Sequence, residues 1–266
     1  MIIVDYISNK TLERNCDFYV LNHVNFSTAS TYLFSSEEIY KIINNNNNVR
    51  FIINMDKVIH EKELNSLNNF LKKYININNC SFLFSDISFL EIVPNQFHNK
   101  LIYSNPSYIQ TKEIQNFFIK LNIKTILSHE LSLKEMLQMN MESAIVDVFG
   151  HSKIFYSKRK LLNLFEKQYK IELPNKNMNI QEINREDRFI INENKVGTLC
   201  YSSNIISYLE ECKYFTNIKL LSDFIDEEKY YQVIGIFKNY NKYTSTDIDK
   251  LLSIKTSKGF LYGGIN

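Results

Sequence analysis

The chain has 266 residues, of which 44% are hydrophobic, and this length and composition suit one large α/β domain with a sizeable core. Its formal net charge of +2 is too small to indicate a nucleic-acid partner, so any electrostatic argument depends on local clusters. No apolar run reaches the roughly 18 residues of a membrane-spanning helix, and the opening MIIVDYISNK has no basic residue before its short apolar run, unlike a signal peptide. The four cysteines, Cys16, Cys80, Cys200 and Cys212, form no CxxC pair, so a cytoplasmic protein with reduced thiols is expected.

Short apolar segments alternate with helical patterns along the chain. The predicted strands are residues 2–6, 18–21, 51–53, 81–84, 101–103, 125–127, 144–149 and 218–221. Helices are predicted at residues 8–15, after Ser35, and at 61–74, 110–121, 132–139 and 227–240. Eight such strands are typical of an α/β fold of the parallel (β/α)8 type, a TIM-like barrel. A doubly wound sheet is the competing architecture.

The interval between the seventh and eighth strands is too long for a simple connection. We expect residues 154–216 to form an insertion within a single barrel domain of residues 1–266. A β-hairpin is predicted inside it, with strands at 188–191 and 198–201 joined by the turn NENKVG. The residues after Asp247 are expected to be a short terminal excursion.

Polar side chains follow nearly every predicted strand, where a barrel of this type has its catalytic face. They are Asn22 and His23, Asn54 and Asp56, Asp86, Asn105, His129 and Glu130, His151, and Asp223. A single polar residue means little there, because any loop after a strand carries polar caps. A full ring of them, however, predicts a pocket for a polar ligand.

Glu130, in the sequence LSHELSL, is the strongest single candidate for catalysis. A carboxylate at that place suits a general base or a contact to a substrate amine or hydroxyl, and the alternative is a helix cap. His129 and His151 suit acid–base chemistry or metal binding, although a lone histidine is more often simply hydrogen-bonded. Their spacing fits no compact zinc motif, so no metal site is predicted.

A basic and aromatic segment follows the seventh strand, which is expected to stop at Gly150. Its cations are Lys153, Lys158, Arg159 and Lys160, and they alternate with aromatic residues. This composition suits RNA, whose phosphates attract cations and whose unstacked bases stack on aromatic rings. The alternative is an amphipathic helix with a solvated lysine face and with Leu161, Leu162 and Phe165 on its buried side.

Four motifs resemble, in order, those of peptidase family U32, the collagenase-like proteases. They are NPSYIQTKEIQNFFIKLNIKTILSHELSL, VDVFGHSKIFYSKRKLL, REDRFIINENKVGTLCYSSNI and NIKLLSDFIDEEKYYQVIGIFKNY. The resemblance covers most of the chain and is to the short, barrel-only form found in Gram-positive bacteria. It departs from the family where NCDFYVLN replaces a glycine-rich entry motif, and where LSDF replaces the ending of the eighth strand.

The resemblance implies either proteolysis, as the family name says, or hydroxylation of a tRNA uridine, an rRNA cytidine or the ubiquinone ring. Several members of the family carry an iron–sulfur cluster on four cysteines. Here Cys200 stands at one such position, whereas Lys153 and Lys160 replace two others. A cluster needs about four thiolates brought together, so no cofactor is predicted.

These inferences lead to the prediction that the chain supports hydroxylation of tRNA uridine. The residues expected to be catalytic are Glu130, His151 and Asp223. The residues expected to bind substrate are Asn54, Asp86, Asn105, His129, Lys153, Lys158, Arg159 and Lys160. One alternative is a peptidase, a hydrolase in which Glu130 and His151 activate a water; another is a non-catalytic subunit paired with a complete paralogue. The expected partners are therefore RNA or a paralogue, and not a membrane.

Overall fold

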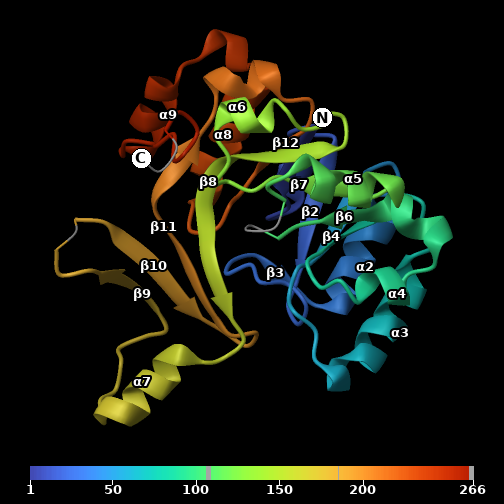
Figure 1. Ribbon diagram of the computed structural model, residues 1–266, viewed down its shortest axis with the longest axis horizontal. Helices are drawn as coiled ribbons and strands as arrows, with labels where there is room; N and C mark the ends of the chain where they lie inside the picture. The colour runs from blue at the N-terminus through green and yellow to red at the C-terminus, as the bar shows by residue number, and fades with distance from the viewer. Residues whose placement is uncertain (106–108, 185, 264–266) are drawn as a thin grey trace.

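The chain folds into a closed barrel of eight parallel strands with helices around it, as the computed structural model of residues 1–105, 109–184 and 186–263 shows (Figure 1). The barrel strands are β1 (Ile2–Asp5), β2 (Phe18–His23), β4 (Phe51–Met55), β5 (Cys80–Phe84), β6 (Leu101–Tyr103), β7 (Lys124–Ile126), β8 (Ala144–Ser157) and β12 (Ile218–Leu220). Because β12 pairs in parallel with both β8 and β1, the ring closes. The predicted (β/α)8 barrel is confirmed. Motif positions 106–108 and 185 and the final residues 264–266 lie outside the described residues.

The helices follow the barrel strands along the chain. They are α1 (Asn9–Leu12), α2 (Ser36–Asn45), α3 (Leu64–Tyr74), α4 (Phe89–Ile92), α5 (Lys112–Lys120), α6 (Leu133–Met136), α8 (Glu227–Lys238) and α9 (Ser245–Leu252), with short turns η1 (Glu61–Glu63), η2 (Asn95–Lys100), η3 (Glu210–Tyr214) and η4 (Tyr240–Lys242). A two-residue strand, β3 (Leu33–Phe34), pairs with β2. The predicted start of α2 is confirmed, because the Ser35 hydroxyl accepts from the Glu38 amide while the Glu38 carboxylate accepts from the Ser35 amide.

A layer of aliphatic side chains fills the barrel below its mouth. Seven strands each contribute one buried residue to this cluster: Ile3, Val20, Ile52, Leu83, Ile102, Ile126 and Ile145. The eighth strand, β12, instead places Lys219 beside Ile3 in the register. Since side chains two apart on a strand point the same way, the residues two further along each strand form the next layer up.

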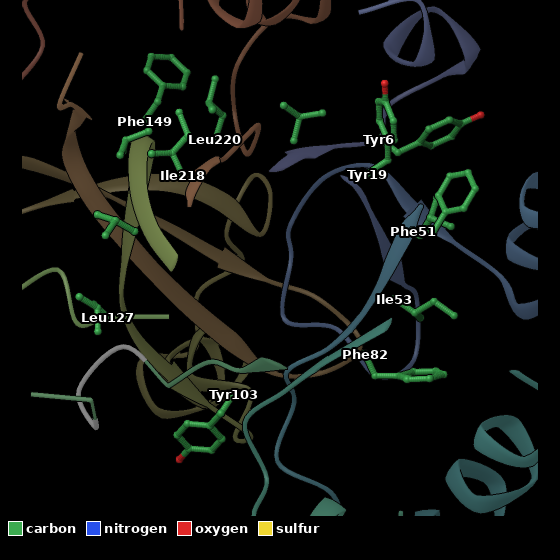
Figure 2. Close-up of a cluster of buried hydrophobic side chains, with 14 of the residues drawn as sticks. Tyr6, Tyr19, Phe51, Ile53, Phe82, Tyr103, Leu127, Phe149, Ile218 and Leu220 are labelled. Carbon is green, nitrogen blue, oxygen red and sulfur yellow. The ribbon is translucent and has the colours of Figure 1, made fainter. Parts of the chain in front are cut away.

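A larger apolar core lies between the ring of strands and the helices. It combines outward-facing strand residues such as Leu21, Ile53 and Leu220 with helix residues such as Ile39 and Phe237. Figure 2 shows several side chains of this cluster around the ring of strands. The apolar residues on both faces explain why the strands read as nearly continuous hydrophobic runs. Together the two cores hold the barrel rigid beneath its polar mouth.

Strand β8 does not end at Gly150, which corrects the sequence prediction. It continues to Ser157 and pairs antiparallel with β11 (Thr198–Ser207), which pairs with β10 (Arg188–Glu193) and through it with β9 (Asn177–Gln181). The predicted hairpin between β8 and β12 is confirmed as β10 and β11. Together with α7 (Leu161–Tyr169), these strands form an arm that projects from the barrel (Figure 1).

Glycine is required where β8 leaves the barrel for the arm. Gly150 has a φ of +118°, which side chains rarely tolerate. A Cβ there would lie 2.6 Å from the Cβ of Leu221 and 2.8 Å from its carbonyl oxygen. Because glycine has no side chain, β8 passes close to Leu221 at this point, and its following residues extend over the open end of the barrel.

The residues after Asp247 are packed against the barrel and do not form the expected excursion. Ile248 and Leu252 of α9 are buried, and so is Leu261. The Ser257 amide donates to the Ile205 carbonyl, and the Ser257 carbonyl accepts from the Ser207 amide, at 2.8 and 3.0 Å. The segment around Ser257 therefore lies beside β11 and is hydrogen-bonded to it.

Candidate functional site at the barrel mouth

A polar layer lies directly above the aliphatic layer of the barrel. Counting two residues on from Ile3, Val20, Ile52 and Ile145 reaches Asp5, Asn22, Asn54 and Asp147. These side chains line a cavity of about 80 Å³ whose floor includes Leu83 and Ile126. We call it the mouth cavity. Because side chains along each strand alternate in direction, the inward-facing residues form a polar cavity directly above an aliphatic layer.

Eight of the residues singled out from the sequence line the mouth cavity: Asn22, Asn54, Asp56, Asn105, His129, His151, Lys153 and Asp223. Asn54 donates to Asn22 Oδ1 and to the Ser27 hydroxyl at 2.9 and 3.0 Å, which fixes its amide between two neighbouring segments. Its own oxygen accepts from the Asp56 amide. These bonds order the loops after β2 and β4.

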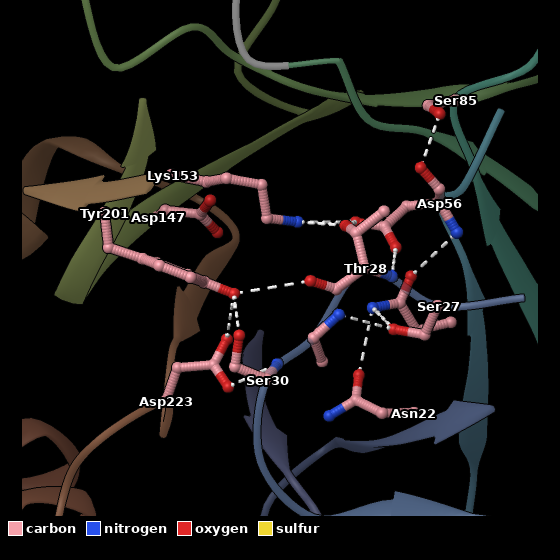
Figure 3. Close-up of polar contacts among 12 residues, drawn as sticks. Asn22, Ser27, Thr28, Ser30, Asp56, Ser85, Asp147, Lys153, Tyr201 and Asp223 are labelled. Atoms are coloured by element: carbon pink, nitrogen blue, oxygen red, sulfur yellow. Dashed lines mark hydrogen bonds and ion pairs between the residues drawn. The ribbon is translucent and has the colours of Figure 1, made fainter. Parts of the chain in front are cut away.

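Lys153 reaches down from β8 to Asp56. Its ammonium lies 2.9 Å from Asp56 Oδ2 and also donates to the Thr28 hydroxyl (Figure 3). Asp56 in turn accepts from the amide and the hydroxyl of Thr28, both at 2.7 Å. Burial alone would raise the pKa of Asp56, but Lys153 and Thr28 hold it below its ordinary value. Asp56 is therefore an anion that anchors Lys153 to the loop after β2.

Asp223 anchors the same loop from the opposite side. Its Oδ1 accepts from the amides of Ser30 and Thr31 and from the Thr31 hydroxyl at 2.9–3.0 Å. The Tyr201 hydroxyl of β11 lies 3.3 Å from its other oxygen and 2.8 Å from the Ser30 hydroxyl (Figure 3). Burial, above all, raises the pKa of Tyr201 well above its usual range, so this phenol stays protonated.

Three charged residues of the mouth cavity lie within strands and were not predicted as site residues: Asp5, Asp147 and Lys219. Lys219 and Asp147 form an ion pair of 3.5 Å. Burial would lower the pKa of Lys219, but Asp147 and Asp5 reverse this effect and raise it. Burial raises the pKa of Asp5 to about 6, although Lys219 and Ser222 oppose the shift. These residues could have been recognised in the sequence as charges inside otherwise apolar strands, and Asp147 is the clearest example.

The histidine of β8 is poised as a hydrogen-bond acceptor. His151 Nδ1 lies 2.8 Å from the Ser202 carbonyl, and because a carbonyl only accepts, Nδ1 carries the proton. Burial lowers the pKa of His151, so the ring is neutral near pH 7 and its Nε2 is unprotonated. Burial likewise lowers the pKa of His129. A neutral base therefore lines the cavity beside its two lysine–aspartate pairs.

Two predicted residues lie away from the mouth cavity. Glu130 is exposed, and its carboxylate accepts from the Gln110 amide at 2.8 Å. Asp86 accepts from the amides of Ile59 and Ser88 at 2.7 and 3.0 Å, so it orders the loop after β5. Neither side chain is among the residues that line the cavity. The structure therefore does not bring Glu130 to His151 as the hydrolytic alternative requires.

The basic segment lies on the arm, outside the mouth cavity. Lys158, Arg159 and Lys160 connect β8 to α7, and the last two are exposed. Only Leu162 of α7 is fully buried, whereas Phe165 and Tyr169 are 45% and 58% exposed. The amphipathic-helix alternative is therefore confirmed for the helix itself and for the buried Leu162, and is wrong for Phe165, which is exposed. A cavity of about 210 Å³ continues from the mouth along β8, and Lys153 and Phe155 line it.

The cysteines do not fit an iron–sulfur cluster. Cys80, Cys200 and Cys212 are buried in β5, β11 and η3, and Cys16 lies between α1 and β2, so the four thiols come from separate elements. A cluster needs about four thiolates brought together. Across residues 1–105, 109–184 and 186–263, no three His, Cys, Asp or Glu side chains gather in a way that would hold a metal ion.

A serine–histidine hydrogen bond elsewhere in the barrel does not form a nucleophile. His23 Nε2 lies 2.9 Å from the Ser36 hydroxyl, while His23 Nδ1 accepts from the Asn25 amide. Nδ1 is therefore unprotonated and the neutral ring donates through Nε2, which leaves no base for the Ser36 proton. Burial lowers the pKa of His23 to about 4, consistent with a structural role.

The fold and the site define a (β/α)8 barrel protein with a polar ligand cavity at the C-terminal ends of its strands. The chain belongs to peptidase family U32, whose model matches residues 9–171, from α1 through α7. The resemblance inferred from the motifs is thereby confirmed. No curated protein matches the chain.

Two solved structures show distant similarity. The spore cortex-lytic enzyme SleL of Bacillus megaterium QM B1551 is 10% identical, with 88% of this chain and 73% of that chain covered and a TM-score of 0.36. A chitinase from Chromobacterium violaceum ATCC 12472 is 5% identical, with 90% and 98% covered and a TM-score of 0.29. These scores are too low to support any inference. Within the described part of the chain, every helix is too short or too polar to cross a membrane.

Proposed function

We propose that this chain supports hydroxylation of a tRNA uridine by holding tRNA beside a barrel mouth that binds a small polar co-substrate. The observation that carries the proposal is the mouth cavity, which is polar, largely enclosed and only about 80 Å³ in volume. A chamber of this size suits a small polar molecule, whereas a peptide would also need the adjoining cavity along β8. Family membership is compatible with this assignment and does not choose it over proteolysis, because the resemblance implied both activities.

The ligand in the mouth cavity would meet paired charges and a neutral base. Lys153 and Lys219 each have an aspartate partner, and Asp5 and Asp223 add two further carboxyl groups to the lining. His151 Nε2 would accept a proton or a hydrogen bond from the ligand. Asp223 would act mainly through Tyr201, whose hydroxyl lies 3.3 Å from its Oδ2 and 2.8 Å from the Ser30 hydroxyl. The catalytic role of Glu130 stays a prediction, and its exposed position gives it no support.

The tRNA would lie along the arm. Lys158, Arg159 and Lys160 supply cations for phosphates, and the exposed rings of Phe155, Phe165 and Tyr169 supply stacking surfaces for unpaired bases. Hydroxylation replaces the hydrogen on C5 of uracil by a hydroxyl group and needs an oxygen donor. The proposal therefore assigns to this chain the binding and positioning of the tRNA and of the small polar co-substrate.

The proposal is tested by nucleoside mass spectrometry of bulk tRNA from cells with and without the gene. Loss of 5-hydroxyuridine derivatives in the deletion, restored by the wild-type gene, is the expected result. An unchanged nucleoside profile would contradict the proposal and favour the peptidase or the partner subunit. If 5-hydroxyuridine is lost in the deletion and returns only when the gene is supplied together with a paralogue, the chain is a partner subunit.

A further inference from the structure

The outermost strand of the arm has an unpaired edge. Strand β9 pairs with β10 on one side and ends the order of strands in the sheet, so within the described residues no strand pairs with its other side (Figure 1). Four of its five side chains are exposed. Such an edge presents backbone amides and carbonyls to any chain that can pair with it.

This edge lacks the features that usually prevent such pairing. The sequence of β9 is NMNIQ, with no proline and no charged residue. Its register with β10 runs without a bulge from Asn177 to Gln181. Native proteins commonly protect an exposed edge with a lysine, a proline or a bulge. The edge of β9 is therefore open to a partner strand.

The register of β9 determines which of its backbone groups point outward. The Lys176 carbonyl accepts from the Glu193 amide of β10 at 2.8 Å. Successive residues of an antiparallel strand direct their backbone groups to alternate sides. The groups that point away from β10 therefore belong to Asn177, Asn179 and Gln181. In agreement, the Asn177 amide donates to Asn175 Oδ1 at 2.9 Å, which covers one end of the edge and leaves its centre at Asn179 open.

The sequence around Asn179 is complementary to itself. When two copies of β9 pair antiparallel about this residue, Lys176 lies opposite the partner's Glu182, and Met178 lies opposite the partner's Ile180. These are the positions without backbone hydrogen bonds, where facing side chains come closest. The pairing therefore has an apolar centre with an ion pair at each end.

The other registers with the same backbone pairing match less well. A shift of two residues in either direction places Lys176 opposite the partner's Ile180, or Met178 opposite the partner's Glu182. The opposite face of β9 carries only side-chain amides, which both donate and accept and so pair with their own kind. The pattern of charges thus selects the register centred on Asn179.

Lys176 is already positioned at the end of the strand. Its side chain is 33% exposed, and its ammonium forms an ion pair with Glu166 of α7. Glu166 also accepts from the Leu173 amide at 2.9 Å, which connects the end of α7 to the start of β9. Because an ammonium has several N–H donors, Lys176 can bind Glu166 and a carboxylate of a partner at the same time.

We infer that two copies of this chain dimerise through the edges of β9, which joins their arms into one continuous sheet with a two-fold axis at Asn179. The symmetry makes each side-chain contact occur twice, so both ends of the interface are closed by an ion pair. A strand of an unrelated protein would share the backbone pairing but not this match of charges. The interface is independent of the proposed function, because none of its residues lines the mouth cavity.

Sedimentation velocity of the full chain, at concentrations from about 1 μM to about 200 μM, tests the dimer. An edge of five residues predicts weak association, with a Kd of about 1–100 μM. We expect a species of twice the 31.5 kDa monomer mass to accumulate as the concentration rises. A chain that stays monomeric over the whole range would overturn the inference.

Two substitutions at the axis separate the backbone from the side chain. Asn179→Pro removes the outward amide and should stay monomeric, while the fold is retained because an edge strand tolerates proline where its N–H faces solvent. Asn179→Ala keeps the amide and should still form the dimer. Thermal unfolding of both variants checks that they are folded. Dimerisation of Asn179→Pro with the affinity of the wild type would place the interface elsewhere and contradict the assignment.

Charge reversal tests the register itself. Lys176→Glu and Glu182→Lys, each alone, should raise the Kd by about 10- to 100-fold, because like charges then face each other at both ends. An equimolar mixture of the two variants brings opposite charges together again and should dimerise like the wild type. Mixing cannot restore the pair between Lys176 and Glu166 within one chain, so recovery identifies a contact between subunits.

Lys120→Glu, at an exposed site on α5, is the matched control and should dimerise like the wild type. Failure of the mixture to recover, or an equal effect of Lys120→Glu and Lys176→Glu, would refute the ion pairs between subunits. Dimerisation that neither charge reversal weakens would do the same.

Discussion

Asp5 shows how the mouth cavity holds a carboxyl group in an unfavourable environment. Burial raises its pKa to about 6, so the folded state binds more protons than the unfolded state between about pH 4 and pH 6. Its contribution to stability therefore falls as the pH rises through that window. Titratable groups held in this way are typical of functional sites.

Asp5→Asn should remove that penalty. We expect the free energy of unfolding at pH 7.5 to increase by about 2 kcal/mol relative to the wild type, with no difference at pH 4. Urea denaturation at the two pH values measures this, and Glu61→Gln, at an exposed site, should change neither value. A gain of the same size at both pH values would show that Asp5 is not the origin of the pH dependence.

Lys153 occupies a position where the family resemblance expects a cysteine, and its ammonium is bound to Asp56. Lys153→Met would leave that carboxylate, only 11% exposed, without its cation. We expect unfolding to become easier by about 2–3 kcal/mol, because a buried charge without its partner is strongly destabilising.

Chemical denaturation of Lys153→Met beside Lys10→Met provides the comparison. Lys10 forms an exposed pair with Glu228, with both side chains more than 60% exposed, so its loss should cost less than about 0.5 kcal/mol. Adding Asp56→Asn to Lys153→Met should recover part of the stability. Equal effects of the two lysine substitutions would refute a structural role for Lys153.

At the scale of elements, Gly150 controls the passage of β8 from barrel to arm. Gly150→Ala should destabilise the fold by about 2–5 kcal/mol, since it combines a strained φ with a Cβ placed 2.6 Å from that of Leu221. Gly235→Ala, in the middle of α8 with open space around it, should instead stabilise by about 0.5–1 kcal/mol. The two variants are compared by chemical denaturation, and a neutral Gly150→Ala would contradict the proposed strain.

Elements with a strong hydrophobic signal could be predicted from the sequence, and those without it could not. The barrel strands are buried on both faces, so runs such as Phe51–Met55 stand out. The second half of β8 mixes polar and apolar residues after Gly150, which indicates a strand end. Its partner β11 begins at Thr198, and a pairing over such a separation leaves no local trace.

The same dependence on local sequence explains which site residues could be predicted and which could not. Residues after a strand were recognisable as a polar rim, and His151, Lys153 and Asp223 do line the mouth cavity. Asp5 and Lys219 were missed because the side to which a strand residue points depends on the stagger of the whole barrel. Glu130 follows its strand in the same way, but the loop turns its side chain to solvent.

At the scale of the whole molecule, the chain is nearly neutral, and the arm carries a run of three adjacent cations, Lys158, Arg159 and Lys160. Replacing Lys158, Arg159 and Lys160 by alanine should weaken binding of an unmodified tRNA transcript and reduce the slope of log K against log salt by about 2. Fluorescence anisotropy between about 50 and 200 mM salt measures both quantities. Alanine at Lys112, Lys120 and Lys134, which are exposed on the outer helices, is the matched control. Equal slopes for the two triple variants would exclude the arm as the RNA contact.

The central claim is that the mouth cavity supports tRNA hydroxylation, and one complementation experiment tests it most directly. A deletion strain is supplied with the wild type, with His151→Asn, or with His60→Asn at an exposed site, all at equal protein levels. The amide of His151→Asn keeps a donor for the Ser202 carbonyl but removes the Nε2 acceptor. We predict that nucleoside mass spectrometry finds 5-hydroxyuridine restored by the wild type and His60→Asn and absent with His151→Asn. Full restoration by His151→Asn would contradict the account.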